Sequence, residues 1–474
     1  MQQDSLKSSV VFTLLGRLAN VLSGALIGIL LARHYGVEVY GQWAAASVYA
    51  MMVANVVEGG LSNTLMRDVS RDKSKAGQAL GLALKGRAVL GAIAVPVALL
   101  AAWWQTGNEG FKLALTLQLV LTRFIEGAFS GWHAVLVALG RYRLTNTLEI
   151  LRRVGLLIVA AALVAADFSI QWVAASGLAI TVITGLIIYW RSLPWVKPTF
   201  ERSVVEGWQS AFWFWISGVL YWVNGEVDQL MLSSMAGDAA TGIYSAAYRA
   251  AMLFQIVPYV LAYVVSPKLY RSTQDGVGLH RHLNGSMLVL SALGIFVGLE
   301  TWWHAGPISD LAYGAKYAAS APVLQAYGVY LFLAYVRTPA SWFVATSDRL
   351  RLTTLFYAIC ALSNIALNLV LIPRMGPEGS AWATVASEAI LLVLMLGTTV
   401  RFVDVRTAWA LLIGASSGLV VVALHRLTVS LPTWYASAVV DGVVVMLLYA
   451  GLVRAVLRGW DPLGLLSARS SARA

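Results

Sequence analysis

The stretch LARHYGVEVYGQWAAASVYA, residues 31–50, is matched later in the chain by LSSMAGDAATGIYSAAYRA, residues 232–250. Each copy keeps two glycines five positions apart, which are Gly36 with Gly41 and Gly237 with Gly242. The charged residues Arg33 and Glu38 of the first copy are not kept. Because glycine adopts backbone conformations and permits close approaches that other residues do not, the repeat predicts one turn built twice, in two halves of one fold.

A second pair of stretches supports the duplication. AAWWQTG ends at Gly107 and ETWWHAG ends at Gly306, an offset of 199 positions against 201 for the first pair. Six apolar runs precede the end of each half, so both halves enter the membrane in the same direction, as parallel repeats do. We predict two six-helix halves, residues 1–200 and 201–402, followed by two further transmembrane helices and a cytoplasmic tail in residues 403–474.

Composition places the whole chain in a membrane. Its 474 residues are 59% hydrophobic and 12% charged, with a mean hydropathy of +0.72, whereas about a quarter of the residues in soluble domains are charged. A bilayer-spanning helix needs about 20 apolar residues, and strands of membrane barrels are about 10 residues of alternating pattern. Long continuous runs therefore predict an all-α, polytopic bundle of about 14 transmembrane helices.

The net charge of +11 follows the predicted topology. With the N-terminus inside, most Lys and Arg residues fall on the cytoplasmic side, including the segments 67–87 and 141–153. This asymmetry agrees with the positive-inside rule and places both termini in the cytoplasm. The basic residues are thus explained by the lipid bilayer and not by nucleic acid. The single cysteine, Cys360, excludes an internal disulfide and a cysteine-based metal cluster.

The most specific pattern lies in SNIALNLVLIPRMGPEGSAWAT, from Ser363 to Thr384, which reads N-x-x-x-N-x-x-x-I-P-x-x-G-x-x-G-x-A from Asn364. With the two glycine-bracketed stretches and Asp228, it resembles the polysaccharide flippases of the Wzx type, in the multidrug/oligosaccharidyl-lipid/polysaccharide (MOP) exporter superfamily. The resemblance covers essentially the whole chain.

That resemblance implies transport and not enzyme chemistry. The expected substrate is an undecaprenyl-diphosphate-linked oligosaccharide, such as an O-antigen (lipopolysaccharide) or capsule repeat unit, moved from the cytoplasmic to the periplasmic leaflet of a bacterial inner membrane. A polysaccharide polymerase or another biosynthesis protein is a further expected partner.

Four arginines lie inside predicted helices, where an ionisable residue usually faces a cavity or a partner. They are Arg17, Arg123, Arg249 and Arg337. A guanidinium binds phosphate oxygens in pairs and stays charged in any surroundings. We therefore interpret the four as substrate-binding, in a cationic central cavity between halves that alternate in access. Structural ion pairs are the other interpretation, with Glu126 as the candidate partner of Arg123 and Glu58 as that of Arg17.

Four acids are candidates for ion coupling, first Asp228 and Glu388, then Glu58 and Glu226. An intramembrane carboxylate can carry a proton or bind Na⁺, so the chain is compatible with coupling to either gradient and needs no bound cofactor. Pairing with the arginines is the other interpretation. Neither catalytic residues nor a metal site are expected, because the six histidines lack metal-ligand spacing and no H-E-x-x-H, G-x-S-x-G or P-loop pattern occurs.

Polar and proline positions add local predictions. Asn364 and Asn368 are four apart on one helix face and predict interhelical hydrogen bonds, with sugar contact as the alternative. Pro258 and Pro339 predict kinks.

Two other functions stay open. A multidrug or small-molecule exporter of the same superfamily would share the fold, although such cavities more often use acids and aromatics, and that family normally has twelve spans. A membrane glycan ligase, polymerase or glycosyltransferase would share the composition, but such enzymes typically carry a large outer loop that this sequence lacks.

Overall fold

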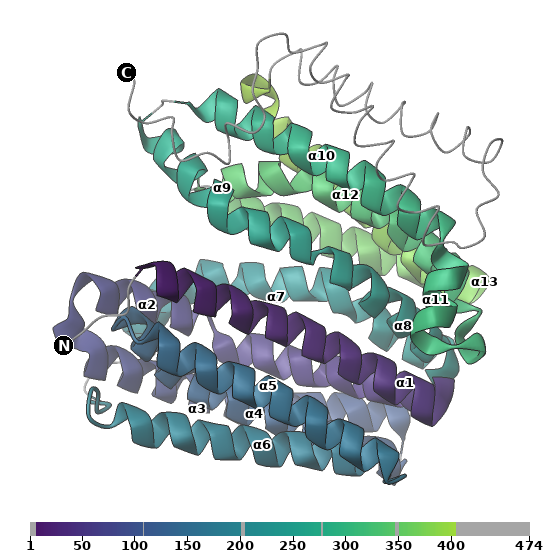
Figure 1. The fold of residues 1–474 in the computed structure, drawn as a ribbon, viewed down its shortest axis with the longest axis horizontal. Coiled ribbons are helices and arrows are strands. Elements are labelled where there is room, and N and C mark those ends of the chain that lie inside the picture. Colours follow the sequence, from purple (N-terminus) through teal and green to yellow (C-terminus); the bar gives the residue numbers. More distant parts are fainter. Residues whose placement is uncertain (1–5, 108, 201–203, 276–277, 347–349, 404–474) are drawn as a thin grey trace. The chain divides into compact units, whose positions relative to one another are not determined.

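The computed structural model describes residues 6–107, 109–200, 204–275, 278–346 and 350–403, and every regular element in these ranges is a helix (Figure 1). The predicted all-α bundle is therefore confirmed. The two helices predicted in the C-terminal segment lie outside the described residues, because the description ends at Val403.

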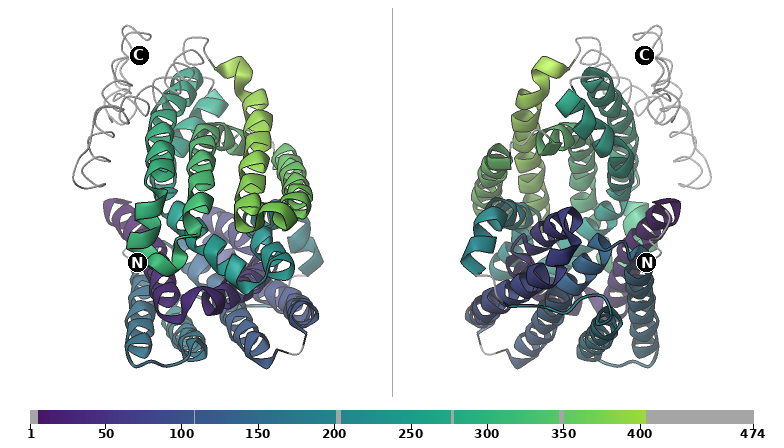
Figure 2. Two further views of the ribbon diagram at one scale, coloured as in Figure 1. Left: turned by 90° about the vertical axis from the view of Figure 1, so that its right-hand side faces the viewer. Right: turned by 90° about the vertical axis from the view of Figure 1, so that its left-hand side faces the viewer.

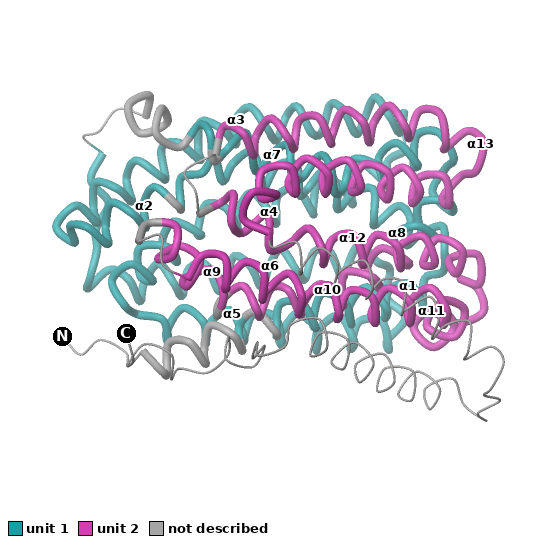
Figure 3. Tube along the Cα trace, turned by 90° about the horizontal axis from the view of Figure 1, so that it is seen from above, with its two compact units in different colours: residues 1–245 teal, residues 246–474 magenta. Residues whose placement is uncertain are grey.

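Contacts between the helices group the chain into two compact units, residues 1–245 and 246–474 (Figure 3). Unit 1 holds α1 (Leu6–Glu58), α2 (Leu61–Arg71), α3 (Ala76–Thr106), α4 (Gly110–Ala138), α5 (Tyr142–Ala165), α6 (Ile170–Ser192) and α7 (Val204–Met235). Unit 2 holds α9 (Ile256–Asp275), α10 (Leu279–Trp303), α11 (Ala305–Tyr313), α12 (Ser320–Thr346) and α13 (Leu350–Thr399). The chain passes from one unit to the other within α8 (Asp238–Phe254). The predicted repeat halves, residues 1–200 and 201–402, are a statement about sequence duplication and stay a prediction.

Several of these helices are long and apolar enough to cross a bilayer. Among the described residues six qualify, or seven if the bent pair Asp238–Ala262 and Val265–Thr273 is one span. Two of the six, α1 and α13, are each divided by a kink at a glycine, Gly36 and Gly376. Within unit 1, α4 packs against α1, α3 and α6, and α5 packs against α1 and α6 (Figure 2). The chain is a multi-pass membrane protein.

Both copies of the repeated glycine pair have the same two structural roles. Gly36 has φ 81° and ψ −178° and breaks α1 into two arms, and Gly237 has φ 87° and separates α7 from α8. Such positive φ values favour glycine. The second glycines do not belong to the turns, contrary to the prediction for Gly41. They let two helices touch, because a Cβ on Gly41 would overlap the Asp238 carbonyl oxygen and one on Gly242 the Val37 carbonyl oxygen.

Pro258 interrupts the helix of unit 2 as predicted. The preceding helix α8 ends at Phe254, four residues before this proline, and α9 starts at Ile256. Pro258 has no N–H to donate to the Phe254 carbonyl. The Tyr335 hydroxyl of α12 donates to that carbonyl instead, and Tyr335 is fully buried. In contrast, α12 continues as a helix through Pro339.

We expect Tyr335→Phe to lower the free energy of unfolding of the protein by about 1–3 kcal/mol, since it leaves a buried carbonyl without a donor. Pro258→Ala supplies an N–H four residues after Phe254, so it should recover part of that loss in the double variant. Thermal unfolding of the four proteins of this double-mutant cycle measures the coupling. Additive effects of the two substitutions would show that Tyr335 does not replace the missing donor.

Candidate functional site

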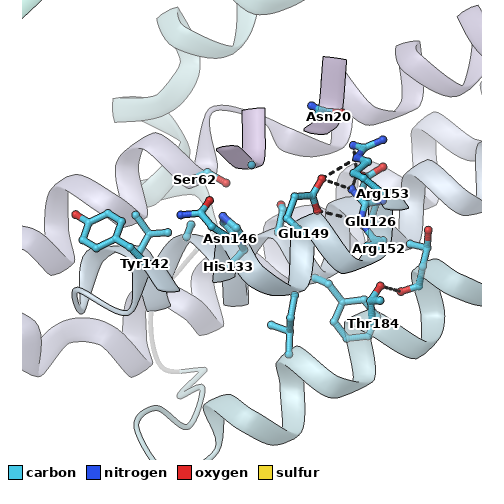
Figure 4. A pocket seen from close by; sticks show the side chains of 18 of the residues that line it. Asn20, Ser62, Glu126, His133, Tyr142, Asn146, Glu149, Arg152, Arg153 and Thr184 are labelled. Carbon is cyan, nitrogen blue, oxygen red and sulfur yellow. Dashed lines mark hydrogen bonds and ion pairs between the residues drawn. The ribbon is translucent and has the colours of Figure 1, made fainter. Parts of the chain in front are cut away.

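A cavity of about 540 Å³ lies inside unit 1, which is within the range of ligand pockets. Helices α1, α2, α4, α5 and α6 form its wall (Figure 4). Most of its lining side chains are polar, namely Asn20, Ser62, Glu126, Ser130, His133, Tyr142, Asn146, Glu149, Arg152, Arg153, Thr181 and Thr184. Polar groups are expensive inside a membrane protein and usually face a functional cavity or a partner, so this cavity is the candidate site.

Helix α5 contributes one continuous polar face to the cavity. Tyr142, Asn146, Glu149 and Arg153 follow one another at intervals of three or four residues, which places them on one side of a helix. On the facing α1, Gly16 comes within contact of Asn146, since a Cβ there would lie 3.2 Å from its Oδ1 atom. Small residues on α1 therefore leave room for the α5 side chains.

Two glutamates and three arginines form an ion network, and all of them except Arg123 line the cavity. Glu149 accepts from Nε of Arg152 at 2.9 Å and from its Nη2 at 2.7 Å, a two-bond fork. It also accepts from Nε of Arg153 at 2.8 Å. Glu126, on α4, accepts from Nη2 of Arg152 at 2.7 Å and from Nη1 of Arg123 at 2.7 Å. Figure 4 shows Glu149, Arg152, Arg153 and Glu126 beside one another.

The network carries an excess of positive charge. Its three guanidiniums face two carboxylates, and the side chains of Arg152 and Arg153 are only 10% and 13% exposed. Buried charges are tolerated only when paired and hydrogen-bonded, so each carboxylate is fully neutralised. Neither carboxylate is therefore left to attract a ligand with positive charge. The third guanidinium, that of Arg123, bonds to Glu126 but does not line the cavity.

A second ion pair lies behind the cavity wall. Nη2 of Arg87, on α3, lies 3.2 Å from Oε2 of Glu58 and 2.7 Å from the hydroxyl of Ser62. Ser130 donates to the same Glu58 oxygen at 3.3 Å, and both serines line the cavity. Arg87 is 1% exposed. Arg87 thus lies inside α3, which begins at Ala76, and not in a loop, while its location on the cytoplasmic side stays a prediction.

The predicted arginines divide between the two units. Arg123 is paired with Glu126, as the alternative interpretation expected. Arg337 lies in unit 2, where its Nε is 2.5 Å from Oε1 of Glu388 and its Nη1 donates to Ser341 at 2.7 Å. Arg249 lies on α8, and the side chain of Arg17 lies outside the described residues. Convergence of all four on one substrate cavity stays a prediction.

The remaining predicted acids have neutral partners. Asp228 is fully buried and accepts from the Tyr244 hydroxyl and from the backbone N–H of Gln229. Glu226 accepts from Nε2 of Gln229 at 2.6 Å. Among the side chains that the structure describes, no group of three or more His, Cys, Asp and Glu residues could hold a metal ion.

The asparagine pair confirms the prediction of interhelical hydrogen bonds. Gly376, with φ 57°, folds α13 into two arms. Nδ2 of Asn364 on the first arm lies 3.4 Å from the Thr384 hydroxyl and 3.3 Å from the Ser387 hydroxyl on the second. Asn368 donates back to Asn364 at 3.0 Å.

Three residues of the candidate site were missed as site residues: Glu149, Arg152 and Arg153. The sequence interpretation counted both arginines with the basic segment 141–153 on the cytoplasmic side and did not consider them as site residues. The spacing E-x-x-R-R is the signal that could have revealed them, since it places a glutamate within ion-pair distance of two arginines on one helix.

Comparison with known protein families identifies the family of this chain. The family of polysaccharide biosynthesis proteins matches residues 6–272, more than half of the chain. The chain belongs to this family. Among curated protein sequences, none matches this polysaccharide biosynthesis protein.

Solved structures share the fold of this polysaccharide biosynthesis protein. The lipid II flippase MurJ, in an inward closed conformation, has a TM-score of 0.75 at 16% identity, over 95% of this chain and 100% of that one. An inward-facing multidrug resistance MATE family transporter of the MOP superfamily has a TM-score of 0.64 at 15% identity, over 80% and 94%. A MOP superfamily transporter from Pyrococcus furiosus has a TM-score of 0.60 at 16% identity, over 83% and 94%. Family and fold together confirm the predicted MOP superfamily membership.

Proposed function

We propose that this polysaccharide biosynthesis protein is a flippase for an undecaprenyl-diphosphate-linked oligosaccharide. It would carry the substrate from the cytoplasmic to the periplasmic leaflet of a bacterial inner membrane, with both termini in the cytoplasm and no catalytic step. The observation that carries the proposal is the polar cavity of unit 1, with its amides, hydroxyls and guanidiniums inside an otherwise apolar bundle. Sugar hydroxyls both donate and accept hydrogen bonds, which this lining supplies.

The charge of the cavity supports a lipid-linked glycan over a cationic drug. Glu126 and Glu149 are occupied by arginines from α4 and α5, so neither is available to a cation without breaking a buried ion pair. The guanidiniums of Arg152 and Arg153 in the lining suit the diphosphate that joins lipid and sugar. A multidrug exporter of the same superfamily is therefore the weaker alternative.

Movement of the substrate requires alternating access of the two sides of the membrane to the site. We propose the following roles for the predicted arginines and acids in this movement. Arg17, Arg123, Arg249 and Arg337 would line the cationic path along which the diphosphate moves. Coupling to Na⁺ or H⁺ would use Asp228 and Glu226, which bond to the neutral side chains Tyr244 and Gln229. Glu58 and Glu388 are already paired with Arg87 and Arg337, so binding of a coupling cation to either carboxylate would require release of that arginine.

Complementation tests this function. In a flippase-deficient strain, wild-type protein should restore surface polysaccharide, and Asn146→Leu should reduce the amount about tenfold, the equivalent of one lost hydrogen bond. Arg249→Ala and Arg337→Ala, made singly, should also reduce it. Ile158→Ala serves as the control, because Ile158 is on α5 but 62% exposed and away from the cavity. Full complementation by Asn146→Leu and both arginine variants, at equal expression, would exclude a transport role for these polar groups.

A further inference from the structure

The guanidiniums of Arg152 and Arg153 each keep one side available in the cavity. Among the described residues, all their hydrogen bonds run through Nε and Nη2, to Glu149 and Glu126. No described partner bonds to the Nη1 group of either arginine, and neither Nη1 is among the fully buried atoms that lack a partner. Both side chains line the cavity (Figure 4). Two adjacent guanidiniums with available donors are the arrangement that recognises phosphate oxygens.

Glu149 and Glu126 hold these arginines in different ways. Glu149 is three and four residues away on the same helix and bonds to the Nε side of both, which fixes their orientation. Glu126 approaches from α4 and touches only Nη2, at 2.7 Å for Arg152 and 3.5 Å for Arg153. Glu126 thus stands where an external anion would stand, as an internal counter-ion.

Glu126 can leave the arginines without becoming an unpaired buried charge. Its other oxygen, Oε2, already accepts from Nη1 of Arg123 at 2.7 Å, one turn earlier on the same helix. A carboxylate that lost every partner would face a penalty of several kcal/mol, about 3–5 when a buried pair is broken. The pairing with Arg123 avoids most of that penalty.

We propose that the cavity of unit 1 binds the diphosphate group of the substrate on Arg152 and Arg153, and that this anion displaces Glu126, which then stays paired with Arg123. The proposal rests on the proposed function for the identity of the ligand. Glu149 is the positioning residue, and Glu126 competes with the ligand and so limits its affinity. Weak, reversible binding is what a translocation site needs, since the substrate must also leave.

Competition by Glu126 predicts that two substitutions in the network change the affinity for pyrophosphate in opposite directions. In purified full-length protein in detergent, inorganic pyrophosphate is titrated at constant ionic strength and its binding measured by calorimetry, with sulfate as the competing anion. Arg153→Gln should weaken pyrophosphate binding at least tenfold, because it removes a charge and the available donors. Glu126→Gln should strengthen it about tenfold, because the internal competitor is lost. Lys112→Gln is the control, since Lys112 is on α4 but pairs with Glu109 and Asp238 outside the cavity.

Several results would overturn the proposal. A purely structural ion network predicts that Glu126→Gln weakens binding or leaves it unchanged. Pyrophosphate that binds no tighter than sulfate would show general attraction of anions only. Thermal unfolding of each variant identifies loss of fold. Arg153→Lys keeps the charge but not the planar donors, so it should give an intermediate affinity for pyrophosphate. An affinity equal to that of the wild type would contradict bidentate recognition.

The same variants separate this site from the flippase proposal. If the affinities change with opposite signs but wild-type protein does not restore surface polysaccharide, the anion site stands and the flippase function fails. If wild-type protein complements but neither substitution changes pyrophosphate affinity, the function stands and the diphosphate site lies elsewhere.

Discussion

Replacing Gly41 with alanine is expected to lower the melting temperature of the purified protein sharply and to reduce the yield of monodisperse material. The added Cβ would overlap the Asp238 carbonyl oxygen and lie 2.9 Å from the backbone nitrogen of Gly242. Overpacking typically costs about 1–3 kcal/mol. Here the obstacles are backbone atoms, which cannot rotate away, so the second arm of α1 and the start of α8 must separate and we expect the upper end of that range.

A glycine on the same helix provides the matched control. A methyl group added at Gly24 would have no neighbouring atom within 4 Å, so Gly24→Ala should change the free energy of unfolding by less than about 1 kcal/mol, with a small gain from helix propensity. Gly242→Ala should resemble Gly41→Ala, because its Cβ would overlap the Val37 carbonyl oxygen. Equal melting temperatures for the Gly41 and Gly24 variants would contradict the close approach of the two repeated stretches.

Replacing Arg152 with alanine is the second substitution for which we expect a large effect. Arg152 bonds to both Glu126 and Glu149 and its side chain is only 10% exposed. Without it, Glu149 keeps Arg153 and Glu126 keeps mainly Arg123, and a positive charge is lost between them. Three hydrogen bonds between charged groups are lost, each worth about 1.5–3 kcal/mol, so thermal unfolding should show a strong loss of stability.

A second-site change distinguishes charge imbalance from a simple loss of packing. Glu149→Gln, introduced together with Arg152→Ala, removes one of the two carboxylates that lost a guanidinium partner and should recover part of the stability. Arg143→Ala is the control for α5, since Arg143 is exposed near the start of the same helix and its loss should have little effect. No recovery in the double variant would indicate that Arg152 acts through packing alone.

The features that sequence patterns predicted well are local ones. Long apolar runs determine helices, positive-φ turns require glycine at 36 and 237, and Asn364 with Asn368 share a helix face because of their spacing. Pro258 likewise removes a hydrogen bond wherever its helix lies. Each of these predictions depends on residues a few positions apart, so no knowledge of the tertiary packing is needed.

How deeply the basic residues are buried in the helix bundle could not be predicted in the same way. Hydropathy marks only the apolar part of a helix, whereas α3 starts at Ala76 and α5 at Tyr142, before their apolar runs. Arg87, Arg152 and Arg153 were therefore counted among the basic residues of the cytoplasmic side and not considered as buried members of an ion network. The partner of Arg337 was also out of reach, because Glu388 is on another helix 51 positions away.

Translocation in proteoliposomes tests the central claim most directly. A labelled, diphosphate-linked oligosaccharide on a polyprenyl lipid is placed in one leaflet, and its appearance in the other is followed with a membrane-impermeant reagent that modifies the sugar. Vesicles with the full-length protein should expose the labelled lipid faster than protein-free vesicles, and Arg153→Gln should slow this about tenfold, in line with its expected loss of ligand binding. Folded wild-type protein that exposes the lipid no faster than empty vesicles would contradict the account.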